Sequence, residues 1–369
     1  MKLFINKIVS FLFPIFLTIV ITNFFVDPGT RFFRKPIVEN KIYSALLQGH
    51  NLTGIGNLDE FSFQQRLILQ TDQCPEIVAV GSSRSMLIHN YYFFPHSFRN
   101  NSIPNCRISE MASFLFEYIE KGCRPDTVLI EVDPWSFDAS HERGAVQNTD
   151  VSRALTALGH SPPAVPRYQK WLRKTKAGVS YVLPLVLPSY FQSSIRQLYR
   201  HDTGIVVTDQ IFNTLPTRLA DGSLSYQKAI NTLTPSESEK LAIKDLDRPD
   251  MKSKITRSHV SHETISLFEN FLKYLEERRI EIIIIDPPLH PLIWEYILQS
   301  PECREVLEWD KILKQIVKKH HILLIGSLNP KSLGMKSTDF ANGFHLNQKG
   351  VTKLLKPIST CSTPNCSSK

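Results

Sequence analysis

The chain lacks the short motifs that normally carry nucleotide, metal or nucleic-acid chemistry. Its 369 residues contain no Walker loop and no G-x-G-x-x-G turn, which argues against a nucleotide site. No two of its six cysteines have C-x-x-C spacing, so neither a zinc ribbon nor a thioredoxin-type site is indicated. It has no block of five or more consecutive basic residues and no RNA-binding aromatic signature. We therefore expect no cofactor, no metal ion and no nucleic-acid partner.

The longest uncharged run lies at the amino terminus. Lys2 and Lys7 precede residues 8–26, nineteen residues without a charged side chain, and Asp27 ends the run. A helix of that length is about 28 Å long, enough to cross the hydrocarbon core of a bilayer. A cleavable signal peptide is the alternative, but the apolar run is longer than a usual signal core and a small-x-small cleavage pattern is missing. We expect residues 1–30 to form an uncleaved signal anchor, with the bulk of the chain outside the cytoplasm.

Charge and cysteine content agree with a chain at the cell envelope. The net charge of +8 suits contact with anionic membrane surfaces or polyanionic envelope polymers. An even cysteine count in an exported chain allows disulfides. Cys361 and Cys366, in a flexible Ser/Thr/Pro tail over residues 359–369, could close a small local loop, or all six cysteines could be free thiols.

Strands and helices alternate in two sections of the chain, residues 76–139 and 256–358. Short apolar runs read as buried strands, and segments with apolar residues at helical spacing follow them. This alternation predicts an α/β fold with a doubly wound, mostly parallel sheet and helices on both faces. The expected strands are residues 77–80, an extended piece near 103, 127–132, 281–285 and 322–325.

Two sections fall outside that alternation. Residues 31–75 are expected to form a membrane-proximal stem with some helix. Residues 140–255 show prolines and short apolar runs without sustained periodicity, which predicts a largely helical insertion. Within it, the basic segment 167–176 leads into the proline-broken apolar segment 179–191. This pair could be a lid that contacts a membrane surface or an acyl chain, or a solvated basic helix leading into a packed hairpin of helices.

A pair of serines follows the first expected strand. Gly81 permits a tight turn after that strand, and Ser82 and Ser83 come next, where a helix is expected to begin. A serine at such a turn exposes its hydroxyl at the carboxyl end of the sheet, beside backbone N–H groups that lack an intrahelical partner. That position suits a nucleophile or an anion site. The alternative is a serine that only caps a helix.

A histidine lies in the loop before the last expected helix. His345 follows Asp339 by six residues and Asn342 by three. A histidine at the same sheet edge as Ser83 can act as a general base, and an oxygen acceptor beside it would fix its tautomer. The alternative is a solvent-facing loop side chain. Asp286 follows another strand at that edge and could bind substrate or a cation, unless the loop is shaped only by its two prolines.

Together the two ends of the chain resemble the SGNH (GDSL-like) hydrolase superfamily. The resemblance rests on Gly81-Ser82-Ser83 after the first strand and on His345-Leu-Asn-Gln-Lys-Gly350 before the last helix. It is closer to the membrane-anchored envelope proteins of this kind, which include alginate O-acetyltransferase accessory proteins and the D-alanyl-lipoteichoic-acid biosynthesis protein. It covers roughly residues 76–140 and 258–355. The resemblance implies a flavodoxin-like three-layer fold, with Ser83 as nucleophile and His345 as base.

The same resemblance implies roles for further residues. Asn105 stands where the family's second block has a glycine that lends an N–H to the oxyanion hole. Asp133 lies near the place of the third-block asparagine, and a carboxylate there would oppose a developing oxyanion. Asn342 holds the place of the usual aspartate, which Asp339 could replace if the loop folds back. Substrate-binding or oxyanion roles are thus expected for Asn105, Asp133, Arg84 and Asp286.

These observations predict a membrane-anchored serine esterase or O-acyltransferase. Its substrate would be an acylated cell-envelope polysaccharide or lipid, attacked through a Ser-His site supported by Asp or Asn. The altered acid and oxyanion positions keep an alternative open. In that alternative the chain is a catalytically inactive SGNH-like subunit, which binds or assembles with partner proteins that modify or export an envelope polymer.

Overall fold

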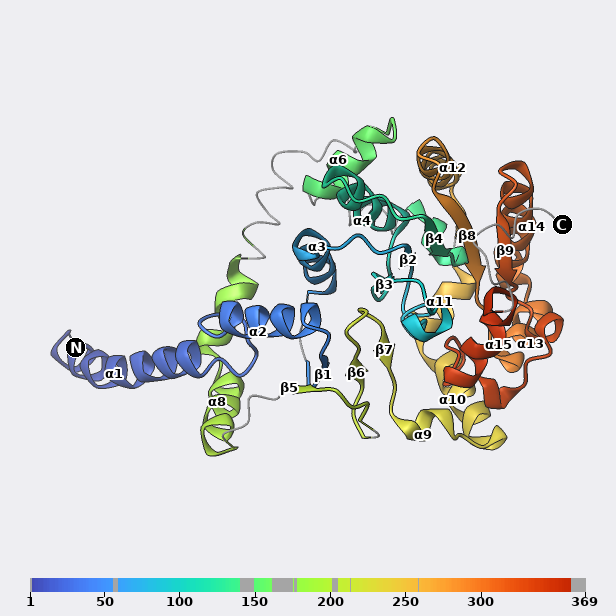
Figure 1. The fold of residues 1–369 in the computed structure, drawn as a ribbon. Helices are drawn as coiled ribbons and strands as arrows, with labels where there is room; N and C mark the ends of the chain where they lie inside the picture. Colours follow the sequence, from blue (N-terminus) through green and yellow to red (C-terminus); the bar gives the residue numbers. More distant parts are fainter. Residues whose placement is uncertain are drawn as a thin grey trace.

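Five parallel strands form the central sheet of the protein (Figure 1). The computed structural model describes residues 2–55, 59–139, 149–160, 175, 178–200, 205–212, 214–257 and 259–359. The strand order across the sheet is β3-β2-β4-β8-β9, which is 2-1-3-4-5 in chain order, the order of flavodoxin-like folds. The strands are β2 (Ile77–Val80), β3 (Phe98–Asn100), β4 (Thr127–Glu131), β8 (Glu281–Asp286) and β9 (Leu323–Gly326).

Helices cover both faces of this sheet, because its central strands bury side chains on both sides. In β4, Val128 and Ile130 belong to a large core formed with α4, α6 and α10 to α14, whereas Leu129 belongs to a smaller core with α15. The expected parallel α/β sheet with helices on both faces is confirmed. The main helices are α4 (Ile108–Glu120), α12 (His262–Glu276), α13 (Pro291–Gln299), α14 (Arg304–Lys319) and α15 (Gln348–Ser359).

The extended piece expected near residue 103 continues from β3. The strand ends at Asn100, but the backbone N–H of Asn101 still donates to Ala79 at 2.8 Å. The N–H of Ile103 donates to Gly81 at 3.0 Å. These two hydrogen bonds hold the chain before α4 beside the turn that follows β2.

The stem and the insertion build a second, antiparallel sheet, which the sequence did not predict. Its order is β5-β1-β6-β7, and β1 (Asn51–Thr53) of the stem lies between two insertion strands. The prediction of a largely helical insertion was therefore incomplete. Strands of two or three residues carry no usable period, and β1 finds its partners more than 150 residues further along the chain. The insertion strands are β5 (Val206–Thr208), β6 (Thr217–Arg218) and β7 (Leu224–Ser225).

Helices complete these two sections. Buried residues of α2, β1 and α3 form a third, smaller core beside the second sheet. In the insertion, α6 contributes to the large core together with α10 and α11. The helices are α2 (Lys35–Leu47), α3 (Glu60–Gln70), α6 (Thr149–Ala157), α8 (Pro188–Arg200), α9 (Lys228–Asn231), α10 (Pro235–Asp247) and α11 (Pro249–Thr256).

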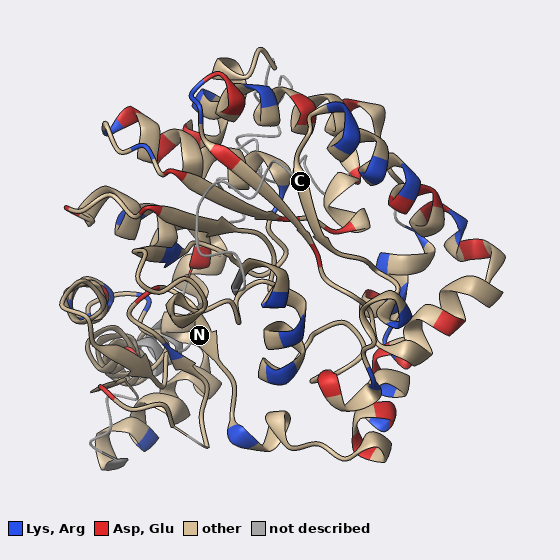
Figure 2. Ribbon diagram, turned by 45° about the vertical axis from the view of Figure 1, so that its right-hand side comes forward, with Lys and Arg blue, Asp and Glu red and all other residues tan. Residues whose placement is uncertain are grey.

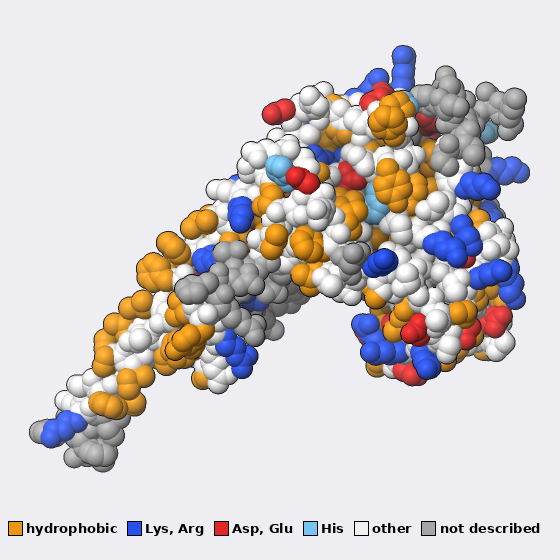
Figure 3. Space-filling model, turned by 60° about the horizontal axis from the view of Figure 1, so that its bottom comes forward, with side chains coloured by type: hydrophobic (Ala, Val, Ile, Leu, Met, Phe, Trp, Pro, Cys, Tyr) orange, Lys and Arg blue, Asp and Glu red, His pale blue; other side chains and the backbone are white. Residues whose placement is uncertain are grey.

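The amino-terminal helix α1 (Lys2–Val26) extends away from the body, and its apolar side chains are visible along the arm in Figure 3. Its carboxyl end is held by specific contacts. The buried Asn23 donates to the Leu185 carbonyl at 2.9 Å, and the Asp27 carboxylate accepts the Phe32 N–H at 2.7 Å and the Tyr190 hydroxyl at 2.8 Å. Among the described residues, no helix meets the length and apolarity needed to cross a membrane.

The expected lid falls into two parts. Except for Thr175, the basic segment 167–176 lies outside the described residues. The apolar segment that follows packs against the end of α1, where Tyr181 and Tyr190 contact the ring of Phe32. In Figure 2, basic and acidic residues are interspersed along the helices of the body.

One disulfide ties the start of the central sheet to its first helix. Cys74, before β2, is bonded to Cys123, after α4, with 5.3 Å between their Cα atoms. Cys106 and Cys303 are buried and lie outside this disulfide. The local loop expected between Cys361 and Cys366 lies outside the described residues.

Candidate active site

The candidate site lies at the carboxyl ends of the parallel strands, where the turn after β2 meets the loop before α15. Gly81 makes that turn possible through its lack of a side chain. A Cβ at this position would lie 2.6 Å from the Cβ of Glu131 and 2.5 Å from the hydroxyl of Ser85. Only glycine allows this close approach, which places Ser82 and Ser83 directly above the end of β4.

Ser83, His345 and Asn342 form a hydrogen-bonded chain. The Ser83 Oγ lies 2.8 Å from Nε2 of His345, and Nδ1 of His345 lies 3.0 Å from Oδ1 of Asn342. The same Oδ1 accepts the backbone N–H groups of Phe344 and His345, each at 3.0 Å, so it must be an acceptor toward the ring as well. His345 therefore carries its proton on Nδ1, and its Nε2 is free to accept the Ser83 hydroxyl proton.

His345 is held in its neutral form. Burial, followed by the nearby positive charges of Arg84 and Lys254, lowers its pKa from 6.5 to about 4, and Asp133 opposes this shift. Asn342 is a neutral amide, so it orients the ring but does not offset the charge of an imidazolium. The arrangement suits a general base that is already unprotonated at neutral pH.

Asp339 does not support His345, contrary to one of the two expected arrangements. Its buried carboxylate accepts Lys353 Nζ at 2.6 Å and the backbone N–H of Lys336 at 2.9 Å. The reason is the shape of the loop, in which Phe340 and Leu346 pair as an antiparallel bridge. This tight turn brings Asn342 beneath the imidazole and leaves Asp339 at its base.

Arg84, for which a role in substrate binding was expected, is engaged by several partners within the protein. It is only 4% exposed. Its Nε donates to the Phe344 carbonyl at 2.9 Å, its Nη2 donates to the Pro288 carbonyl at 2.8 Å, and its Nη1 forms an ion pair with Asp133. The guanidinium thus joins the turn after β2 to the loops after β4 and β8 and before α15.

Asp133 is likewise occupied within the protein. It accepts the Ser82 hydroxyl at 3.0 Å in addition to its ion pair with Arg84. A carboxylate at this position was expected to oppose a developing oxyanion. The adjacent guanidinium offsets that charge, and the group acts instead to hold the serine turn in place.

Two further carboxyl groups are buried around the same arginine. Glu131 accepts the Ser82 N–H and, at 3.2 Å, the Ser85 hydroxyl. Burial first, then repulsion from Asp133, raises the pKa of Glu131 well above its usual value. Burial raises the pKa of Asp286 to about 8. Asp286 accepts the Leu328 N–H at 3.1 Å and lies beneath the surface, so its expected role in substrate binding does not fit its position.

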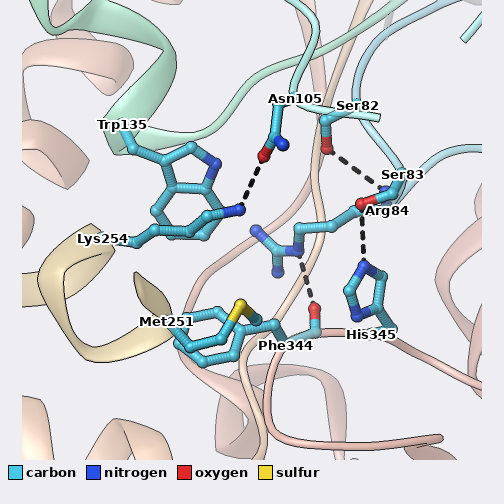
Figure 4. Close-up of a pocket in the computed structure, with 9 residues that line it drawn as sticks. All are labelled: Ser82, Ser83, Arg84, Asn105, Trp135, Met251, Lys254, Phe344 and His345. Atoms are coloured by element: carbon cyan, nitrogen blue, oxygen red, sulfur yellow. Dashed lines mark hydrogen bonds between the residues drawn. The ribbon is translucent and has the colours of Figure 1, made fainter. Parts of the chain in front are cut away.

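A small hollow opens above Ser83 (Figure 4). Asn105 borders it in a left-handed backbone conformation, with φ of 54°, which asparagine tolerates better than most residues. Its Oδ1 accepts Lys254 Nζ at 2.8 Å. The lining residues are Ser82, Ser83, Arg84, Asn105, Trp135, Met251, Lys254, Phe344 and His345.

Several of these residues were not predicted from the sequence. Lys254 and Met251 belong to α11 in the insertion, and no motif there indicates a site. Trp135 lies in the loop region after β4, a position at the functional edge that could have been noted. In the part of the chain that the structure describes, no group of three or more His, Cys, Asp or Glu side chains is placed to hold a metal ion.

Comparisons with known proteins add little to this geometry. No protein-family model matches the chain, and no curated protein matches it. Solved structures do match. One, a Streptococcus pneumonia protein described as a platelet activating factor, is 8% identical with a TM-score of 0.37, over 81% of this chain and 91% of that one. The site is therefore interpreted from its own residues.

The protonation of Asp286 gives a prediction for stability. A pKa raised to about 8 in the folded state, against about 3.9 in the unfolded chain, means that the folded protein holds a proton the unfolded chain releases. The contribution of this proton to the free energy of unfolding is complete below about pH 4 and is lost as the pH rises to 8. The loss is at most about 1.4 kcal/mol per pH unit. Asp286→Asn, which cannot ionise, should lose less stability than the parent between pH 5 and pH 9.

Thermal unfolding followed by circular dichroism at several pH values measures this difference. All other titrating groups are shared, so their effects cancel in the comparison of parent and variant. An identical fall of the melting temperature in both proteins would show that Asp286 is ionised in the folded state.

Proposed function

We propose that the protein is a serine esterase or O-acyltransferase with Ser83 as its nucleophile. The observation that carries this proposal is the 2.8 Å contact between Ser83 Oγ and the unprotonated Nε2 of His345. A hydroxyl in contact with a neutral imidazole, whose other nitrogen is fixed by an acceptor, is the arrangement that activates serine. The resemblance of the serine turn and the histidine loop to SGNH hydrolases supports the same reaction.

The reaction proceeds through an acyl-enzyme. Ser83 Oγ attacks the ester carbonyl carbon as its proton passes to Nε2 of His345. The carbonyl π electrons move onto oxygen, which faces the Ser83 N–H and the Asn105 amide. Collapse of this intermediate breaks the ester C–O bond, and the imidazolium returns its proton to the leaving alkoxide. Water or a sugar hydroxyl then attacks the acyl-enzyme and gives its proton to His345. Collapse of this second intermediate breaks the acyl C–Oγ bond, and the imidazolium returns its proton to Ser83 Oγ.

The donors around Ser83 fit this step. Among the described residues, the Ser83 N–H has no hydrogen-bond partner. It lies at the turn that carries the nucleophile, beside the place where the substrate oxygen would become negatively charged. Asn342 takes the orienting role of the usual aspartate without its charge. The imidazolium that forms is therefore less stabilised than in a Ser-His-Asp site, which favours a slow enzyme.

The size and lining of the hollow favour a short acyl group. Its enclosed space is about 10 Å³, far below that of a drug-sized ligand pocket. Its apolar walls come from Trp135, Met251 and Phe344. We propose an acylated cell-envelope polysaccharide or lipid as the substrate, with its larger part remaining outside the hollow.

Membrane attachment through α1 belongs to the same proposal. Large apolar side chains are exposed along this helix, including Phe11 at 69% and Phe13 at 60%. The Cys74–Cys123 disulfide supports an oxidising compartment outside the cytoplasm. The contacts of Asn23 and Asp27 with the segment before and within α8 would hold the catalytic body in a defined orientation to the membrane.

Labelling by a fluorophosphonate probe tests the nucleophile. Ser83→Ala should lose all labelling, because it removes the hydroxyl that lies 2.8 Å from the acceptor nitrogen of His345 at the candidate site. Ser332→Ala, which removes an exposed hydroxyl, serves as the matched control and should label like the parent. Equal labelling of Ser83→Ala and the parent would contradict the proposal, and would favour the alternative of a non-catalytic subunit.

The pKa of His345 predicts an unusual pH dependence. A general base must be unprotonated, so kcat/KM should stay constant down to about pH 4 and then fall about tenfold per pH unit. Hydrolysis of p-nitrophenyl acetate, corrected for its spontaneous rate, gives the profile. An acidic limb centred near pH 6.5 would mean that the imidazole is not shielded as described.

Extraction of cell membranes with alkaline carbonate tests the anchor. The parent should stay in the membrane pellet, whereas Ile15→Asp combined with Leu17→Asp should move to the soluble fraction. Each aspartate at the centre of an inserted helix costs about 3 kcal/mol. Leu298→Asp adds a charge at an exposed apolar position on α13 and is the control that should stay in the pellet. Release of the parent by carbonate would refute an integral anchor.

A further inference from the structure

We propose that Lys254, on helix α11 of the insertion, positions the side-chain amide of Asn105 as a donor to the oxyanion. This inference rests on the proposed acyl-transfer function and names a residue that acts through Asn105 and does not itself touch the reacting atoms. It gives the insertion a part in the chemistry, in addition to its packing.

The chemistry of the two side chains determines how Asn105 is oriented. A lysine side chain donates hydrogen bonds and accepts none, so the atom of Asn105 that lies 2.8 Å from Lys254 Nζ must be the carbonyl oxygen Oδ1. The amide nitrogen is then directed to the other side. In Figure 4 the oxygen of Asn105 faces Lys254, and its nitrogen lies on the side of Ser82 and Ser83.

The backbone holds Asn105 at the correct distance from the nucleophile. The Ile103 N–H donates to the Gly81 carbonyl at 3.0 Å. Ser83 is two residues beyond Gly81, and Asn105 is two residues beyond Ile103. The left-handed conformation of Asn105 turns the chain immediately before α4. The hydrogen bond from Lys254 restricts the rotation of the Asn105 side chain.

The fold also fixes Lys254 in place. Met251 and Ile255 of the same helix are buried in the large core, at 8% and 1% exposure, so α11 cannot shift easily. The Lys254 ammonium lies 5.5 Å from the centre of the Trp135 ring, a distance at which an aromatic face attracts a cation. Trp135 thus helps to hold the ammonium group of Lys254 beside Asn105.

A positive charge behind the amide strengthens its effect on the reaction. The ammonium polarises the Asn105 carbonyl, which makes the amide N–H groups stronger donors. Because donor and cation are already in place, they stabilise charge that develops on the substrate oxygen without reorganising. Loss of Lys254 should therefore slow the chemical step more than it weakens substrate binding.

Steady-state hydrolysis of p-nitrophenyl acetate by the full chain tests this role. Lys254→Met should lower kcat about 10- to 100-fold with KM changed less than about twofold, since one oxyanion donor is worth about 100- to 1,000-fold. Lys254→Arg, which retains a donor and a positive charge, should recover most of the loss. Lys252→Met removes a neighbouring lysine on the same helix that faces Glu302, and should match the parent.

A double-mutant cycle separates positioning from a purely structural effect. If Lys254 acts through Asn105, adding Lys254→Met to Asn105→Ala should cause no further loss of kcat. This inference alone would be overturned if the losses of kcat in the two single variants multiplied in the double variant. It would also be overturned if Lys254→Met were as fast as the parent while Ser83→Ala was inactive. Equal hydrolysis by Ser83→Ala and the parent would overturn the proposed function, and this inference with it.

Discussion

The geometry of the site depends on one buried guanidinium. Arg84 follows the proposed nucleophile in the chain, and its hydrogen bonds reach the loop that carries His345, the loop after β8 and the carboxylate of Asp133 after β4. Without the arginine, each of these partners would be a buried polar group without this hydrogen bond, which would lower the stability of the fold. Since the arginine satisfies them together, the separation of Ser83 and His345 is set by packing and not by flexible loops.

The same arginine determines the charge balance beneath the serine. Three carboxyl groups, Glu131, Asp133 and Asp286, surround one guanidinium, and burial raises the pKa of the first and third. The direct ion pair is with Asp133. Burial and, after it, the nearby cations keep His345 neutral, and its other partner is the uncharged Asn342. The amide of Asn342, in place of a carboxylate, distinguishes this arrangement from a Ser-His-Asp site.

The insertion contributes to both the fold and the site. Its strands complete a sheet around β1 of the stem, and its helix α11 borders the hollow with Met251 and Lys254. Another part of it packs against the end of α1 through Tyr190 and Leu185. The insertion is thus in contact with the amino-terminal helix, the second sheet and the candidate site.

The sequence by itself determined the parallel sheet and the two loops that meet at its edge. Apolar runs such as residues 281–285 are a local property of the chain, and parallel strands bring their carboxyl ends together whatever lies between them, so Ser83 and His345 could be paired. Only the tertiary structure decided between Asn342 and Asp339, because a turn of a few residues selects which one lies under the ring. It alone showed Arg84 as a tie, the second sheet and Lys254 beside Asn105. Each of these depends on contacts between segments that lie far apart along the chain, and no local period or motif records them.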